Sequence, residues 1–158
     1  PGQKILIKGN HDLWWQSLTK IKKVLPKGIH LLQNNHFSVE GKSICGTRGW
    51  SFPGYDDFES SDYKVYRREL MRLESSLRSA KQTHPEQDIV VMLHYPPFDN
   101  QRNPTGFVDL MQEYKVKTCV YGHLHGDVKQ FAVNGHIQGI TYYLVASDYI
   151  NFTPQLIK

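Results

Sequence analysis

The residues best suited to chemistry are two histidines, His123 and His125, which lie one residue apart between two glycines. They follow residues 118–121, a stretch that predicts a β-strand, so we expect them on a tight loop at its end. Imidazoles at positions i and i+2 of such a loop can converge on one point, and neutral imidazole is the commonest metal ligand in proteins. The pattern therefore predicts a metal site at the end of this strand.

Two other predicted strands end in side chains of the same kind. These are Asn10, His11 and Asp12 after the strand predicted over 4–8, and His94 after the apolar run 89–93. In an open α/β sheet, functional sites form outside the carboxyl ends of the strands. We therefore expect the three segments to build one shared site.

The candidate side chains supply nitrogen and oxygen donors without a thiolate, which suits a catalytic Mn, Fe or Zn ion better than a structural zinc. The candidate metal ligands are Asn10, His94, His123 and His125. Two such ions, about 3.5–4 Å apart, would activate a water as hydroxide and clamp the attacking and leaving oxygens of a phosphoryl transfer. His11 directly follows a candidate ligand, so it can stabilise the charge on phosphorus or protonate the leaving oxygen, and Asp12 can orient it.

In this order and spacing, the three motifs resemble the calcineurin-like metallophosphoesterase superfamily over residues 4 to about 126. The motifs are Gly9-Asn10-His11-Asp12, His94 after an apolar strand, and Gly122-His123-Leu124-His125. The resemblance implies an α/β fold with a two-sheet β-sandwich flanked by helices, the trailing strands belonging to the second sheet, and a dinuclear metal centre. It matches Asn10, His94 and His123 to ligands of one metal, His125 to a ligand of the other, and His11 to the catalytic histidine.

The sequence departs from the family pattern at its start. The family carries Asp-x-His on a first strand and Gly-Asp-x-x-x-Asp on a second, and no Asp-x-His occurs in these 158 residues. Because the sequence begins at Pro1, we expect residues 1–158 to be the C-terminal part of a single metallophosphoesterase domain without its first strands. We expect weak or single-metal binding and little activity from this part alone. We also expect self-association through the sheet edge that the missing strands leave exposed.

Hydrophobic periodicity predicts helices that alternate with strands in a mixed α/β chain. The predicted helices span about 13–25, 62–81 and 107–114, and the predicted strands span 4–8, 29–32, 37–39, 43–46, 88–93 and 118–121. Apolar residues at helical spacing in 62–81 predict that this helix lies on a sheet. After the last motif, strands over 128–133 and 137–140 are predicted to form a hairpin that turns at Asn134-Gly135.

The composition is that of a soluble globular protein, with 39% hydrophobic and 22% charged residues and no segment resembling a signal peptide or membrane helix. We therefore expect a cytoplasmic location and no membrane partner. The net charge of +4 includes a lysine cluster that we interpret as a solvated helix face, so nucleic acid is not an expected partner. Cys45 and Cys119 are interpreted as buried, reduced side chains within strands.

The prediction is a metal-dependent phosphohydrolase that cleaves phosphoester bonds by metal-activated hydroxide, acting on a phosphorylated small molecule or a phosphodiester. One alternative is a DNA or RNA nuclease of the same superfamily, although the sequence lacks an obvious basic groove with interleaved aromatic residues. The other alternative is a non-catalytic scaffold of the same fold. The presence of all the motif histidines together with Asn10 argues against a scaffold.

Two arginines are candidate substrate contacts, both on loops expected to set specificity. Arg48 and Trp50 lie in the loop 47–57 and can offer a guanidinium and an aromatic wall to a phosphorylated ligand. Arg102 lies in the loop 99–106, beside His94. The alternatives are that Arg48 and Trp50 form a packed turn and that Arg102 is solvated.

Overall fold

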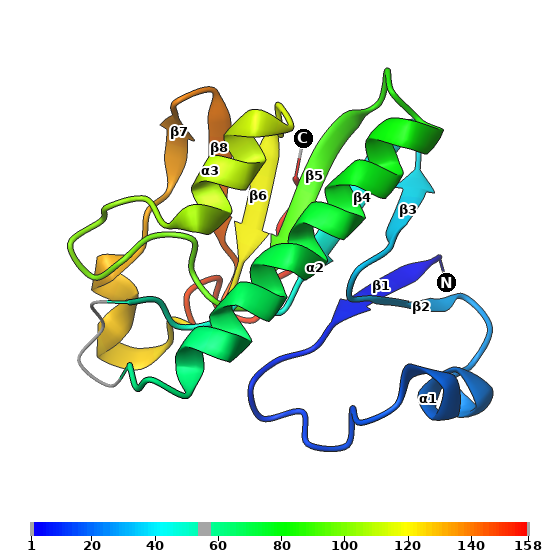
Figure 1. Ribbon diagram of the computed structural model, residues 1–158, viewed down its shortest axis with the longest axis horizontal. Helices are drawn as coiled ribbons and strands as arrows, with labels where there is room; N and C mark the ends of the chain where they lie inside the picture. The colour runs from blue at the N-terminus through cyan, green and yellow to red at the C-terminus, as the bar shows by residue number, and fades with distance from the viewer. Residues whose placement is uncertain (1, 54–57, 158) are drawn as a thin grey trace.

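The computed structural model describes residues 2–53 and 58–157, and the larger of its two sheets has six strands (Figure 1). Their order is β3-β4-β5-β6-β8-β7. The strands span His36–Val39 (β3), Lys42–Thr47 (β4), Asp88–Leu93 (β5), Thr118–Tyr121 (β6), Gly135–Ile137 (β7) and Ile140–Leu144 (β8). The four central strands β4, β5, β6 and β8 are parallel, and the edge strands β3 and β7 pair antiparallel.

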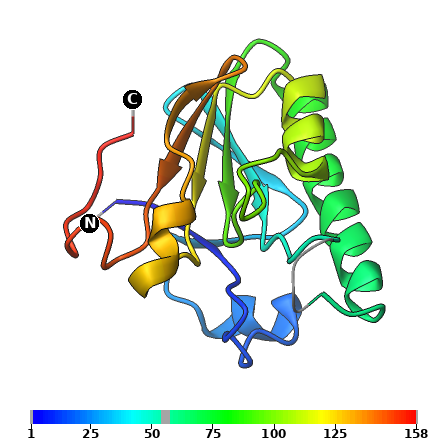
Figure 2. The same ribbon diagram turned by 90° about the vertical axis from the view of Figure 1, so that its left-hand side faces the viewer.

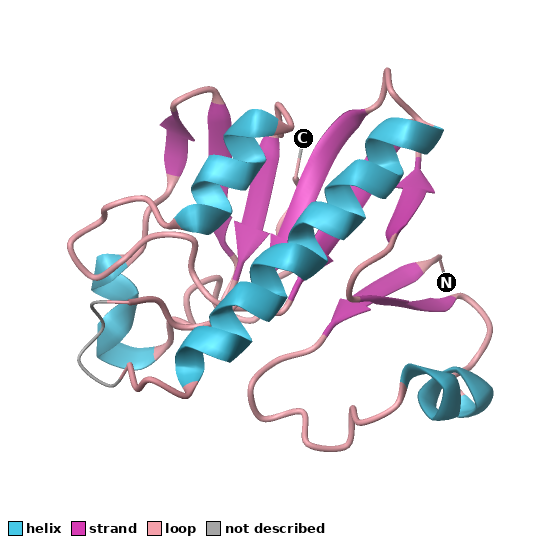
Figure 3. Cartoon of the chain, in the orientation of Figure 1, coloured by secondary structure: helices cyan, strands magenta, loops and turns pink. Residues whose placement is uncertain are grey.

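The smaller sheet pairs β1 (Lys4–Ile7) in parallel with β2 (Ile29–Leu32). The connection between them contains α1 (Leu18–Val24), and Figure 3 shows this β-α-β unit beside the larger sheet. β2 contacts β4, and Leu31 and Leu32 are buried. A mixed α/β fold with two sheets flanked by helices is therefore confirmed.

The helices α2 (Asp62–Thr83) and α3 (Gly106–Glu113) cover one face of the six-stranded sheet (Figure 2). The predicted apolar stripe of α2 lies on that face, with Leu73 and Leu77 fully buried and Tyr66 and Leu70 packed against the core. Burying a leucine side chain in this way contributes roughly 1.5–3 kcal/mol. This packing fixes the sheet whose strand ends carry the site.

The opposite face of the sheet is less covered, as the alternating burial along β5 shows. Ile89, Val91 and Leu93 are buried, whereas Val90 and Met92 are only half-buried. Cys45 and Cys119 are free and buried, as predicted. Within the part of the chain that the structure describes, no helix is long and apolar enough to cross a membrane.

Two predictions of local structure were wrong. The first helix begins at Leu18, because the Ser17 side chain accepts a hydrogen bond from the Lys20 amide and caps it there. The segment predicted as a strand over 128–133 lies in a 3₁₀ helix, η1 (Gly126–Phe131). The hairpin turns at Gln138 and Gly139, whose φ values of 50° and 83° suit a two-residue turn.

The asparagine predicted to make that turn has another role. Asn134 Oδ1 accepts a hydrogen bond from the Leu144 amide at 2.7 Å, so this side chain braces β8 instead of turning the hairpin. β7 and β8 also join the same sheet as β5 and β6. The expectation that the trailing strands belong to the second sheet was therefore wrong, and the second sheet of the described chain is the pair β1 and β2.

Candidate metal centre

Three parallel strands of the larger sheet end in register, and the candidate site lies at these ends. Thr47 of β4 pairs with Leu93 of β5, which in turn pairs with Tyr121 of β6. The loops beyond them are tied through their backbones. The His94 amide donates to the Arg48 carbonyl at 3.0 Å, and the His94 carbonyl accepts from the Gly122 amide at 3.2 Å. The sheet therefore fixes where the histidines after β5 and β6 begin.

Asn10, His94 and His123 come together although they lie far apart in the sequence. His94 Nε2 lies 2.8 Å from Asn10 Oδ1 and 3.2 Å from His123 Nδ1. Two ligands bound to one ion at about 2.1 Å are roughly 3.0–3.4 Å apart when they subtend 90–109°. His94 Nε2 is therefore spaced from each of the other two donors much as neighbouring ligands of a single ion are, and the donor set fits a divalent metal.

The environment of these imidazoles keeps them in the form that binds metals. Burial lowers the pKa of His94 to about 4, and the neighbouring His123 acts in the same direction. Burial also lowers the pKa of His123, followed by the charges of His125 and His11. Both rings are consequently neutral near pH 7, and a metal ion would not have to displace a proton from them.

The loop that carries His123 has a left-handed turn at His123 and is held by the carboxylate of Asp148. The φ of His123 is 69°, a left-handed conformation that is uncommon for a residue with a side chain. The Gly126 amide donates to Asp148 Oδ2 at 2.9 Å and so secures the far end of this loop. Sequence reasoning missed Asp148. The strand-end rule points to it once β8 is known to run parallel to β6.

The remaining motif residues surround this cluster. Asp12 accepts hydrogen bonds from the Gly9 amide at 2.6 Å and from the Trp14 indole N–H at 2.9 Å. Its carboxylate therefore shapes the turn that presents Asn10, and its predicted role of orienting His11 stays a prediction. His11 and His125 are exposed, and His11 is close enough to affect the pKa of both His94 and His123.

The described residues contain no set of three His, Cys, Asp or Glu side chains arranged to hold a metal ion. The Asn10 oxygen is thus the third donor beside His94 and His123, and His125 stands apart as a candidate for a second ion. A sequence-family model for calcineurin-like phosphoesterases matches residues 2–127 and includes all of these motifs. The chain belongs to the calcineurin-like phosphoesterase family. No curated protein and no solved structure gave a significant match.

Membership of this family indicates metal-dependent phosphoester hydrolysis in general terms. In this phosphoesterase, Arg48 is 11% exposed and forms an ion pair with the fully buried Glu69 at 3.4 Å. Its guanidinium carbon lies 4.2 Å from the centre of the Trp50 ring. Burial lowers the pKa of Arg48, and Glu69 opposes this effect. The arginine therefore packs against Glu69 and Trp50 in the turn after β4, and its predicted contact with substrate stays a prediction.

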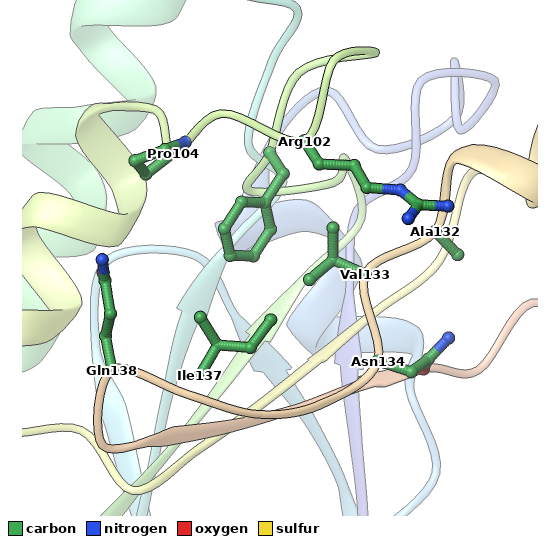
Figure 4. Close-up of a pocket in the computed structure, with 8 residues that line it drawn as sticks. Arg102, Pro104, Ala132, Val133, Asn134, Ile137 and Gln138 are labelled. Atoms are coloured by element: carbon green, nitrogen blue, oxygen red, sulfur yellow. The ribbon is translucent and has the colours of Figure 1, made fainter.

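Arg102 lies away from the histidines of the phosphoesterase site. It lines a separate cavity of about 250 Å³ together with Phe98, Val133 and Ile137. Figure 4 shows its side chain extending toward Ala132 and Val133, and its Nη2 donates to the Gln130 carbonyl at 3.3 Å. The structure does not bring Arg102 to the metal-ligand candidates.

Proposed function

We propose that the chain is the C-terminal part of a metal-dependent phosphohydrolase that cleaves a phosphoester bond of a phosphorylated small molecule or a phosphodiester. The observation that carries the proposal is the position of His94 Nε2, which lies 2.8 Å from Asn10 Oδ1 and 3.2 Å from His123 Nδ1. A convergent set of one amide oxygen and two neutral imidazoles is a metal-binding arrangement. A cytoplasmic location is part of the same proposal.

The residues that would hold the metals follow from this arrangement. Asn10, His94 and His123 would bind one Mn, Fe or Zn ion, and His125 would contribute to a second. When bound, such ions lower the pKa of water and neutralise the charge of the phosphate. The other ligands that the family resemblance implies lie in motifs that these 158 residues lack. Full dinuclear activity is therefore proposed only where those ligands are supplied.

The chain's own groups then act on the substrate. In hydrolysis, a water oxygen forms a bond to phosphorus as the bond to the leaving oxygen breaks. A monoester gives an alcohol and phosphate, and a diester gives an alcohol and a phosphate monoester. His11 is exposed beside the ligand cluster, where a protonated imidazole can donate its proton to the departing oxygen. Asp12 holds the turn that carries both Asn10 and His11, so it positions one ligand and the proton donor together.

Calorimetric titration with Mn²⁺ tests the proposal most directly. We expect at least one ion to bind the wild-type chain, and His94→Ala to weaken binding by about 100-fold or more because it removes the central donor. His136→Ala is the matched control, since His136 is exposed on β7. Two ions per wild-type chain would mean that the missing ligands are supplied, for example by a second chain. Equal binding by both variants would refute the proposed centre.

We also propose that the chain self-associates through the smaller sheet. β1 pairs only with β2 in the sheet order of the described chain, so the other edge of β1, along Ile5, Leu6 and Ile7, has no neighbouring strand there and could pair with another strand. Sedimentation velocity should show a species larger than 18.3 kDa whose fraction rises with protein concentration. A sedimentation coefficient that stays at the monomer value over a hundredfold concentration range would contradict this.

A further inference from the structure

A second cavity, of about 240 Å³, borders the candidate metal centre, and its lining includes the aromatic side chains of Trp50, Phe52, Tyr95 and His123. Trp50, Tyr95 and His123 form one wall, and we call this space the aromatic pocket. His123 also lines the more open cavity of about 540 Å³ that holds His94 and His125. One imidazole thus separates the place where phosphorus would react from the aromatic pocket.

We propose that the aromatic pocket receives the leaving group of the phosphoester and selects a planar aromatic group with a polar edge. This inference rests on the proposed function, because it takes the cluster of Asn10, His94 and His123 as the place of phosphate binding. A leaving group attached to a phosphate on one side of His123 reaches the pocket on the other side.

The rings of the pocket are held in fixed positions. The Trp50 and Tyr95 ring centres are 5.2 Å apart, and those of Tyr95 and His123 are 4.2 Å apart. The Trp50 indole N–H donates to Asp62 Oδ1 at 2.9 Å, which ties the ring to the start of α2. A preorganised wall of rings favours an aromatic guest by stacking, in addition to the apolar area that it buries.

A glycine makes this close approach of rings feasible. Gly49, directly before Trp50, has a φ of 74°, and a Cβ on it would lie 3.2 Å from the Cβ of Tyr95. The tight turn therefore brings Trp50 against the loop of His94 and Tyr95. The pair forms part of the pocket wall. Both residues follow strands that lie side by side in the sheet, β4 and β5 (Figure 1).

The size of the pocket suits one ring system. A cavity of about 150 Å³ accommodates benzene, and sites for drug-sized ligands begin at roughly 300 Å³. At about 240 Å³, the aromatic pocket has room for a single substituted ring or two fused rings. A longer chain or a polymer would not fit inside it.

Polar groups in the aromatic pocket favour a ligand that has a hydrogen-bonding group on the edge of its ring. The Ser51 hydroxyl oxygen is buried and has no hydrogen-bond partner within the described part of the chain. A buried hydroxyl without a partner is unfavourable, and a ligand that bonds to it would recover the lost hydrogen bond. The Asn100 amide, which can donate and accept, also lines the pocket.

The test compares two non-hydrolysable phosphonates on the zinc-loaded chain by NMR. Benzylphosphonate and ethylphosphonate carry the same phosphonate and differ by an aromatic ring. We expect benzylphosphonate to shift the indole N–H signal of Trp50, identified with Trp50→Phe, and to bind about tenfold more tightly than ethylphosphonate. Ser51→Ala should weaken the binding of 4-hydroxybenzylphosphonate more than that of benzylphosphonate. Tyr63→Ala removes an exposed ring of α2 outside the pocket and serves as control.

Hydrolysis separates this inference from the function on which it rests. Benzyl and ethyl phosphate have leaving alcohols of similar acidity, so their ratio of kcat/KM reports the pocket and not the reactivity of the ester. We expect a ratio of about ten that falls toward one in Trp50→Ala. Hydrolysis of both esters at equal rates, or equal binding of the two phosphonates, would overturn the inference. If neither ester is hydrolysed, the phosphonate comparison alone decides the pocket, whereas failure of the wild-type chain to bind Mn²⁺ would overturn the proposed function.

Discussion

The buried carboxylate of Glu69 connects the main helix to the candidate centre, and its neutralisation by Glu69→Gln is the sharpest test of how the site is supported. Glu69 is fully buried and pairs with Arg72 at 2.7 Å and with Arg48 at 3.4 Å. The Thr47 hydroxyl at the end of β4 donates to the same carboxylate. Glutamine keeps the size of the side chain and can still accept this hydrogen bond, so the variant isolates the loss of charge.

The size of the effect follows from the exposure of the two arginines. Arg48 is 11% exposed and Arg72 is 29% exposed, so neither guanidinium is fully hydrated once its partner is neutral. Breaking a buried ion pair costs about 3–5 kcal/mol, and partial exposure reduces this figure. We expect Glu69→Gln to lower the free energy of unfolding by about 2–3 kcal/mol. We also expect it to loosen the Arg48–Trp50 contact.

Urea unfolding followed by circular dichroism measures this effect as a shift of the midpoint at constant slope. Glu74→Gln is the matched control, because the Glu74–Arg78 pair on the same helix is exposed and should be worth less than about 1 kcal/mol. Adding Arg48→Met to Glu69→Gln should restore part of the lost stability, since it removes the charge left without a partner. Equal midpoints for Glu69→Gln and Glu74→Gln would refute the reasoning.

Two further predictions concern stability. Burial, aided by the charge of His84, lowers the pKa of His36 below 6.5, so the unfolded chain binds more protons and stability should decline as pH falls below about 6.5. His36→Gln should make the decline shallower in urea titrations between pH 7 and 5, and an unchanged slope would contradict this. Gly46→Ala places a Cβ 2.1 Å from the Met92 carbonyl oxygen and should cost about 3 kcal/mol or more, whereas Gly122→Ala, with 3.8 Å of clearance, should cost less than half as much.

The parts of the fold that could be predicted are those in which neighbouring residues determine the structure. Helical spacing of the apolar residues predicts α2, and short apolar runs predict β5 and β6. The hairpin after the last motif was misplaced because Asn134-Gly135 carries a strong local turn signal. A distant contact overrides that signal, since Asn134 bonds to the backbone of β8.

The motif residues of the site could be predicted from the sequence, but the buried residues that hold them in place could not. The rule that sites form at the carboxyl ends of strands predicted that three side chains would lie close together. They do so in the structure, and they are Asn10, His94 and His123. Nothing in the sequence indicated a structural role for Glu69, because a glutamate in a helix with many charged residues is expected to be exposed to solvent. Its burial depends on Thr47 and Arg48 arriving from β4, which only the assembled sheet provides.

Asp148 was missed because the sequence did not reveal the direction of β8, although the rule that sites form at strand ends applies to it. The rule requires parallel strands, and β8 was expected to belong to a second, antiparallel sheet. The structure instead pairs β8 in parallel with β6, so the segment after β8 leaves the sheet at the same edge as His123. Asp148 there accepts from the Gly126 amide and forms an ion pair with Lys129 at 3.7 Å. A carboxylate that follows a fourth parallel strand thereby holds the loop after β6. The site thus depends on β8 and on β1 of the smaller sheet as well as on β5 and β6.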